Sequence, residues 1–145
     1  GKTTRAMLVT ILWRMAGEPY GRVSSFADVQ PGSWYDTAVC WAADNGIVTG
    51  VTAQTFAPDA PVTREQLCAI LARFAAYRGQ NTAAADTLSA FSDGSQTADY
   101  AKNAVNWALA RGIVAGVGAD RLAPQDTATR AQLAVMLYRF AKSGN

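Results

Sequence analysis

The chain has 145 residues, half of them hydrophobic, and its 13 basic and 11 acidic side chains give a formal net charge of +2. A chain of this length and composition can bury one modest core, and its charges are scattered rather than clustered as a phosphate-tracking surface requires. We therefore expect one compact domain that does not bind nucleic acid. No apolar run approaches the length of a membrane span, and if the parent protein is secreted, its signal peptide is expected upstream of this segment.

Hydrophobic residues recur at helical spacing in five segments, which predicts five helices joined by ordered loops. The expected helices occupy residues 4–16, 34–44, 63–77, a stretch around 104–108, and 129–142. Loops are expected at 20–31 and 49–61, the second with a short extended stretch at 55–56, and the polar residues 80–90 indicate a linker. Gly46 is placed to end the second helix, because glycine tolerates the left-handed conformation common at helix ends.

The most informative feature of the sequence is an internal repeat. Residues 34–75 return as residues 100–141 at a constant offset of 66, with roughly 20 of 42 positions identical. A third, partial copy lies at residues 4–14, where Arg5 aligns with Arg64. The chain thus holds two and a half units and lacks the first half of the first. We expect an all-α architecture in which repeated helix pairs stack to bury faces that they cannot bury alone.

Each copy places a Thr-Arg pair at the start of a helix. The threonine has a structural explanation, because Thr63 with Gln66, and Thr129 with Gln132, match the capping box that satisfies backbone donors at a helix start. The arginine has no such explanation, since a cation in the first turn opposes the helix dipole at a cost of roughly 0.3–1 kcal/mol.

Arg5, Arg64 and Arg130 therefore each require a compensating partner. One alternative is a carboxylate of the protein. The candidates in the sequence are Asp28, Asp59, Asp93 and Asp126. The other alternative is an external anion, because a helix N-terminus beside a guanidinium forms a ready-made anion site. The residues alone leave both alternatives open.

Most other arginines and tryptophans have structural explanations. Arg14, Arg73 and Arg139 lie near the ends of their helices, where a cation suits the dipole. Trp41 and Trp107 fall on helix faces and are expected in the core.

Two aromatic residues and two cysteines are less clear. Trp34 and Tyr100 follow loops, so they either pack in the core or expose a ring that could stack on the apolar face of a sugar. Cys40 and Cys68 are expected as half-buried thiols, with a disulfide as the weaker alternative.

Enzyme chemistry finds little support in the sequence. The chain has no histidine, which excludes Ser-His and Cys-His nucleophiles, and two thiols alone do not close a zinc site. The carboxylates are spread through turns, which leaves a glycosidase pair of aspartates as a minor alternative. We expect a non-catalytic chain with no metal and no cofactor.

Three motifs recur in the same order in the second and third copies. The second copy has Phe26-x-Asp28-Val29, Gly46-Ile47-Val48-x-Gly50 and Thr63-Arg64-Glu65-Gln66-Leu67. The third has Phe91-x-Asp93, Gly112-Ile113-Val114-x-Gly116 and Thr129-Arg130-Ala131-Gln132. Together they resemble the S-layer homology domain of bacterial surface proteins, and the resemblance covers nearly the whole chain apart from the linker.

The resemblance implies a single domain with a pseudo-threefold helical body. Its parts would be the second half of motif 1 at residues 1–19, motif 2 at 26–79, the linker at 80–90 and motif 3 at 91–144. Such domains hold proteins to the cell wall by binding secondary cell-wall polysaccharide, often through a pyruvylated and hence anionic sugar. The implied location is extracellular, at the cell wall, without membrane insertion. The alternative is a surface protein-interaction or spacer module that has lost glycan binding.

The resemblance also assigns ligand-binding residues. These are Arg5, Arg64, Arg130, Asp28, Asp93, Trp34, Tyr100, Gly46 and Gly112. Because each arginine precedes an Asp-aromatic pair in the next unit, we expect Arg64 to group with Asp93 and Tyr100 in a groove. Arg5, Asp28 and Trp34 should form the equivalent group.

Two departures from the repeat have consequences. Met7 stands where the later copies have glutamine and cannot complete a capping box, so the first helix should fray most. The missing half unit should leave part of the first helix, including Trp13, uncovered, and Arg130 facing an incomplete groove. Exposed apolar surface of this kind favours association. We expect the chain either to self-associate through the first helix or to be a truncated piece of a longer protein.

Overall fold

The structure is a computed structural model that describes residues 1–21 and 26–143. Its α-helices are α1 (Arg5–Met15), α2 (Asp36–Asp44), α3 (Arg64–Tyr77), α4 (Lys102–Ala110) and α5 (Arg130–Ser143). Short 3-10 helices are η1 (Leu88–Ala90), η2 (Gly94–Gln96) and η3 (Asp99–Ala101). The five predicted helices are confirmed, and the described residues contain isolated β-bridges but no strand, as an all-α fold requires.

No β-strand forms at residues 55–56, where a short extended stretch was expected. Thr55 accepts hydrogen bonds from the backbone of Val51 and Thr52, which closes a turn, and the N–H of Phe56 is bound by a side chain instead of a neighbouring strand. Within the predicted loop at 20–31, residues 22–25 lie outside the described part of the chain.

The chain divides into two compact units. One comprises Thr3–Pro61, and the other comprises Gly1–Lys2 together with Val62–Asn145. We refer to them as the α1–α2 unit and the α3–α5 unit. The expectation of a single domain remains a prediction.

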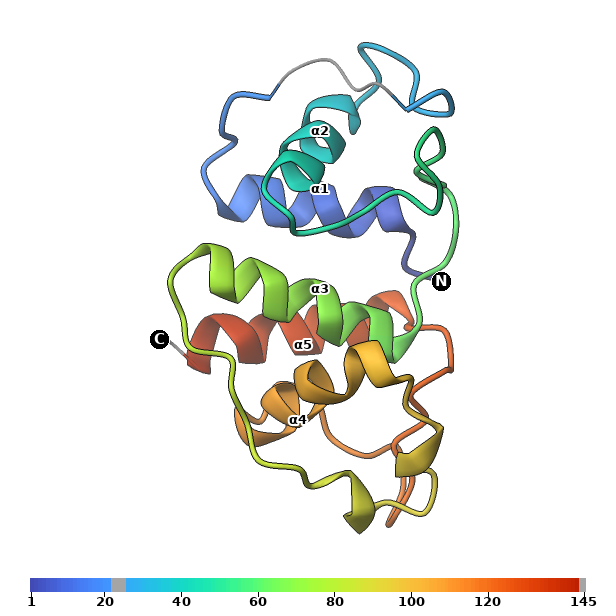
Figure 1. Ribbon diagram of the computed structural model, residues 1–145, viewed down its shortest axis with the longest axis vertical. Helices are drawn as coiled ribbons and strands as arrows, with labels where there is room; N and C mark the ends of the chain where they lie inside the picture. Colours follow the sequence, from blue (N-terminus) through green and yellow to red (C-terminus); the bar gives the residue numbers. More distant parts are fainter. Residues whose placement is uncertain (22–25, 144–145) are drawn as a thin grey trace. The chain divides into compact units, whose positions relative to one another are not determined.

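In the α1–α2 unit, the two helices pack against each other (Figure 1). Leu8 and Leu12 of α1 and Val39 and Trp41 of α2 are buried, and the ring of Phe56 from the following loop is fully buried too. The confirmed burial of Trp41 and of its repeat counterpart Trp107 fits their positions on helix faces.

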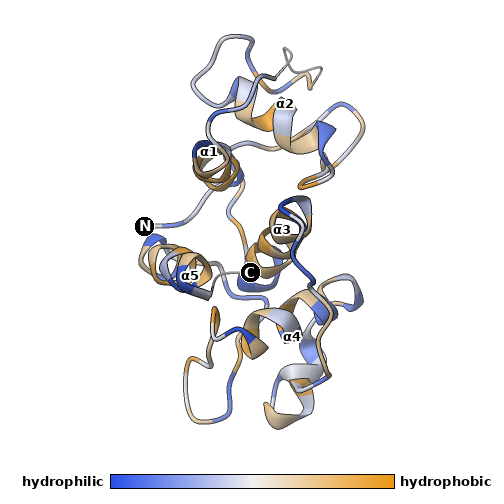
Figure 2. Cartoon of the chain, turned by 90° about the vertical axis from the view of Figure 1, so that its left-hand side faces the viewer, coloured by the Kyte–Doolittle hydropathy of each residue, from blue (hydrophilic) through white to orange (hydrophobic). Residues whose placement is uncertain are grey.

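In the α3–α5 unit, α3 packs along α4, and aromatic rings link all three helices. The Phe140 ring of α5 lies 6.0 Å from that of Phe74 in α3 and 6.2 Å from that of Trp107 in α4. Figure 2 shows hydrophobic residues on each of these helices. This cluster forms the core that positions the loops after α4.

The helix starts follow the predicted capping chemistry. Thr63 accepts a hydrogen bond from the N–H of Gln66, whose side chain binds the N–H of Thr63 in return, and Thr129 with Gln132 does the same. Thr4 accepts from the N–H of Met7 alone. The first capping box is therefore half complete.

The two motif glycines end their helices as expected. Gly46 has φ of +71° and Gly112 has φ of +70°. In both cases the glycine N–H and the next N–H bond back to carbonyls of the last turn: Gly46 to Ala43, and Ile47 to Ala42. This is the Schellman arrangement, which needs a left-handed residue.

Part of the predicted linker at 80–90 packs against the rest of the α3–α5 unit. Leu88 is buried in η1, and the side chain of Asn106 in α4 accepts hydrogen bonds from the N–H and hydroxyl of Thr87 at 2.9 and 3.2 Å. A side chain on Gly94 would collide with the Leu88 carbonyl, so glycine is required there.

Cys40 and Cys68 are both thiols rather than a disulfide, and both are buried more deeply than expected. Burial raises the pKa of the Cys68 thiol to about 12, which keeps it protonated and unreactive. Among the described residues there is no cluster of metal-ligating side chains, and none of their helices has the length and hydrophobicity to cross a membrane.

Candidate functional site

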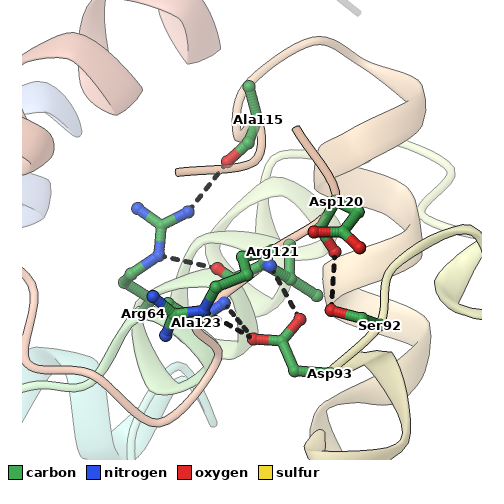
Figure 3. Close-up of polar contacts among 8 residues, drawn as sticks. Arg64, Ser92, Asp93, Ala115, Asp120, Arg121 and Ala123 are labelled. Atoms are coloured by element: carbon green, nitrogen blue, oxygen red, sulfur yellow. Dashed lines mark hydrogen bonds and ion pairs between the residues drawn. The ribbon is translucent and has the colours of Figure 1, made fainter. Parts of the chain in front are cut away.

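The site begins with the helix-start arginine of α3. The Nε of Arg64 donates to the carbonyl oxygen of Leu122 at 3.1 Å, and Nη2 donates to that of Ala115 at 2.8 Å (Figure 3). Arg64 is only 5% exposed. Its guanidinium therefore ties both ends of the loop after α4 to the start of α3. Burial lowers the pKa of Arg64, an effect opposed by Cys68, Asp126 and Asp93.

Asp93 holds the same loop from the other side. Its two carboxylate oxygens accept the N–H groups of Leu122 and Ala123, each at 2.8 Å. Ala123 has φ of +52°, a left-handed conformation that is costly for alanine. The hydrogen bond from Leu122 leads the effects that lower the pKa of Asp93; Ala123 and the charge of Arg121, 4.0 Å away, add to it while desolvation opposes it.

The α1–α2 unit repeats this arrangement. Arg5 donates from Nε to the carbonyl of Phe56 at 2.9 Å and from Nη2 to that of Thr49 at 2.6 Å. Asp28 accepts the N–H groups of Phe56 and Ala57, each at 2.8 Å, and Ala57 has φ of +61°. Desolvation would raise the pKa of Asp28, but these hydrogen bonds outweigh it and the pKa is lowered.

We call this repeated feature the Arg-loop-Asp clamp, formed by Arg64 and Asp93 in one unit and by Arg5 and Asp28 in the other. In each clamp the arginine binds a carbonyl while the aspartate binds the N–H of that same residue, Leu122 or Phe56. The direct partners of the two guanidinium groups are thus backbone carbonyls. The protein carboxylate that the sequence offered as one alternative is therefore not their direct hydrogen-bond partner.

The aromatic residue expected beside Arg64 lies against the two residues that follow it in α3. Tyr100, 55% exposed, interacts with Glu65 and Gln66, the residues that follow Arg64. Partial burial, and then the negative charge of Glu65, raises the pKa of the Tyr100 phenol, so the group stays neutral. In the other unit Trp34 is 62% exposed and meets the ring of Tyr35 edge-on at 4.8 Å. Both loop-following aromatics therefore expose a ring.

The third arginine has a different environment. The Arg130 backbone N–H donates to the carbonyl of Gly1 at 2.7 Å, and its side chain is exposed. Among the described residues its guanidinium has no hydrogen-bond or ion-pair partner. A ligand-binding role for Arg130, as for the other residues that the sequence analysis assigned, remains a prediction.

Sequence reasoning missed part of this architecture. Glu65 is buried, and its carboxylate accepts the N–H of Ala98 at 3.1 Å, which joins the start of α3 to the segment before Tyr100. Arg121 beside Asp93 was missed too. The repeat carried no indication of either contact, because Ala6 and Ala131 stand at the other copies of the Glu65 position and Thr55 stands at the copy of the Arg121 position.

The fold and clamps define a class of protein: an all-α repeat module whose loops are fixed to helix starts. The S-layer homology domain family matches residues 25–68 and 90–134, which is more than half of the chain. The chain belongs to this family.

Individual relatives agree with this assignment. An amylopullulanase of Thermoanaerobacterium thermosulfurigenes is 34% identical over 98% of this chain, and the surface-layer 125 kDa protein of Lysinibacillus sphaericus is 33% identical over 79%. The S-layer protein of Bacillus thuringiensis subsp. finitimus is 27% identical over 96%.

The chain spans only 8%, 10% and 17% of the lengths of these three relatives. The shared part is the S-layer homology module, so the catalytic name of the first relative does not extend to this chain. Modules of this family anchor surface proteins to the cell wall and bind cell-wall polysaccharide, which places this chain among non-catalytic cell-surface anchoring modules.

Proposed function

We propose that this chain anchors its parent protein by binding an anionic, pyruvylated secondary cell-wall polysaccharide. The observation that carries the proposal is the repeated combination of a clamped loop with an exposed aromatic ring, Trp34 in one unit and Tyr100 in the other. An exposed aromatic ring offers a surface on which the apolar face of a sugar can stack.

The clamps support the proposal through preorganisation. A loop held by two carbonyl bonds from an arginine and two N–H bonds to an aspartate loses little freedom when a ligand binds, which lowers the entropic cost of association. In this proposal Arg5, Arg64, Asp28 and Asp93 shape the site, while Trp34 and Tyr100 contact sugar. Gly46 and Gly112 aim the loops by ending α2 and α4.

The binding test uses the intact chain and purified wall polysaccharide, with dextran as a neutral polysaccharide control. We expect saturable binding to the wall polysaccharide and none to dextran. Trp34→Ala and Tyr100→Ala should weaken binding, because each removes an exposed ring, whereas Tyr138→Ala, which changes an exposed tyrosine on α5, should not. If wild-type chain binds neither polysaccharide, the glycan-binding function is rejected in favour of a protein-interaction or spacer module.

A further inference from the structure

A cleft lies in the α3–α5 unit where one face of α3 meets the residues around the start of α4. Its volume is about 210 Å³. The residues that line it are Ala69, Ala72, Arg73, Ala76, Thr82, Tyr100, Asn103 and Ala104. The cleft is smaller than the roughly 300–1,000 Å³ of typical ligand pockets. It is therefore suited to one sugar residue, not to a long stretch of polysaccharide.

The lining separates into an apolar wall and a polar rim. Four alanines present only methyl groups, and the polar atoms come from Arg73, Thr82, Tyr100 and Asn103. The Asn103 amide nitrogen donates to the carbonyl of Thr82 at 3.0 Å, which fixes the amide and leaves its oxygen as an acceptor. The side chain of Arg73 is exposed, and within the described parts of the chain it has no hydrogen-bond or ion-pair partner.

The charge of the cleft is set by Arg73. The carboxylate of Glu65 interacts with Tyr100, but Glu65 is buried and binds the Ala98 N–H, so it does not line the cleft. A guanidinium, a phenol ring and an amide oxygen around methyl groups match three parts of an acidic sugar: its carboxylate, its apolar face and a hydroxyl group.

The repeat does not require a small side chain at the position of Ala72. Trp13 in α1 stands at the position of Ala72, one residue before Arg14 as Ala72 is one residue before Arg73. The indole of Trp13 is half-buried, and its Nε1 donates to the Pro19 carbonyl at 2.9 Å. The same helix position thus carries a bulky side chain in one unit and a methyl group beside an open cleft in the other.

We propose that the α3–α4 cleft is the subsite for the carboxylate-bearing sugar of the polysaccharide, with Arg73 as the group that binds the carboxylate. This inference rests on the proposed function and adds the location of the charged sugar. Tyr100 stacks on the ring of this sugar, and the Asn103 amide oxygen accepts one of its hydroxyl groups. The buried Arg64 supports the neighbouring loop and does not touch the sugar.

The test compares three variants of the full chain with wild type: Arg73→Ala, Ala72→Trp and Arg139→Ala. Arg139 occupies the same repeat position in α5 as Arg73 in α3, is exposed, and does not line the cleft, so it controls for the loss of one positive charge. The probes are wall-polysaccharide fragments that carry pyruvate and the same fragments after mild acid has hydrolysed the ketal.

Arg73→Ala should weaken binding of the pyruvylated fragment about tenfold or more, the loss that one charge-assisted hydrogen bond represents, and leave binding of the depyruvylated fragment unchanged. Ala72→Trp should block both fragments by filling the cleft, and Arg139→Ala should bind as wild type does. In NMR spectra, the Asn103 side-chain amide should shift when the pyruvylated fragment is added to wild type.

If Arg73→Ala binds the pyruvylated fragment as tightly as wild type does, the subsite is elsewhere and the inference is overturned while the proposed function stands. Circular dichroism establishes that each variant is folded, and the Arg73→Ala result decides even where Ala72→Trp fails to fold. Failure of wild-type chain to bind either fragment would overturn the proposed function and this inference together.

Discussion

At the scale of single residues, the helix-start arginines are loop anchors. Arg64 satisfies two backbone carbonyls of a loop 51 and 58 residues away in sequence, and Arg5 does the same at 44 and 51 residues. A lysine carries one compact ammonium group and cannot reproduce the fixed fork of a guanidinium. This explains why a cation occupies a helix start that the dipole disfavours.

Replacing Arg64 by methionine should destabilise the chain by about 1–3 kcal/mol, because two backbone carbonyls lose their donor. Arg130→Met is the matched control, since the Arg130 guanidinium has no partner within the described residues, and it should change stability by less than about 0.5 kcal/mol. Urea unfolding at neutral pH measures both. Equal effects of the two substitutions would contradict the anchor role.

The clamp aspartates should make stability depend on pH in acid. The pKa values of Asp28 and Asp93 are lowered in the folded chain, so the folded state favours the ionised form of both side chains. Their contribution is fully present above the ordinary aspartate value of 3.8 and is lost as the pH falls through and below it.

In Asp28→Asn and Asp93→Asn chains, the stability that the replaced carboxylate contributes should no longer be lost as the pH falls. Thermal unfolding between pH 7 and pH 2.5 tests the prediction, and Asp120→Asn is the control because Asp120 is exposed and bonds to Ser92 through its backbone carbonyl. If the unfolding temperature of both clamp variants falls with decreasing pH as steeply as that of wild type, other groups control the loss of stability in acid.

At the scale of elements, the capping boxes account for a difference between the three repeated helices. α3 and α5 each begin with a reciprocal pair of hydrogen bonds between threonine and glutamine, whereas α1 has only the bond from Met7 to Thr4. The missing second bond should make the first turn of α1 the least protected of the three.

Met7→Gln should complete the box and stabilise the chain by roughly 0.5–1 kcal/mol, the net value of one such hydrogen bond. The reverse change, Gln66→Met in α3, should destabilise it by a similar amount. Hydrogen exchange of the first-turn amides provides the measurement. Unchanged protection in Met7→Gln would mean that the start of α1 is limited by something other than capping.

The sequence predicted the elements well because repeat, period and caps agree at these positions. It placed all five helices, the capping threonines and the helix-ending Gly46 and Gly112. It also expected Arg64 close to Asp93, and the two side chains bind the same loop residue, Leu122; the grouping of both with Tyr100 in a ligand groove stays a prediction. It failed where a contact depends on the path of a loop. The acceptors of Arg64 are backbone carbonyls, and because every residue has one, no residue type in the sequence indicates which carbonyls are used.

The cleft beside Arg73 was missed for a related reason. A cation near a helix end is explained by the dipole alone, and three small residues on one helix face suggest close packing as readily as open space. Only the placement of Tyr100 and Asn103 across from these alanines distinguishes a cleft from a packed interface.

At the scale of the whole molecule, the chain is an anchoring module that forms a small part of each relative it matches. Trp13 on α1 is half-buried, and we propose that its exposed part supports self-association of the chain. Light scattering on the isolated chain should detect a dimer that Trp13→Ala weakens. A monomer at all accessible concentrations would contradict this expectation.

The central claim is that the module recognises a negatively charged wall glycan. The most direct measurement is titration calorimetry of wild-type chain with pyruvylated fragments of the wall polysaccharide and with the same fragments after removal of pyruvate. We expect the pyruvylated fragment to bind more tightly by about tenfold or more, because its carboxylate forms charge-assisted hydrogen bonds, and we expect this difference to shrink as salt is added. Equal affinity for the two fragments would contradict the account.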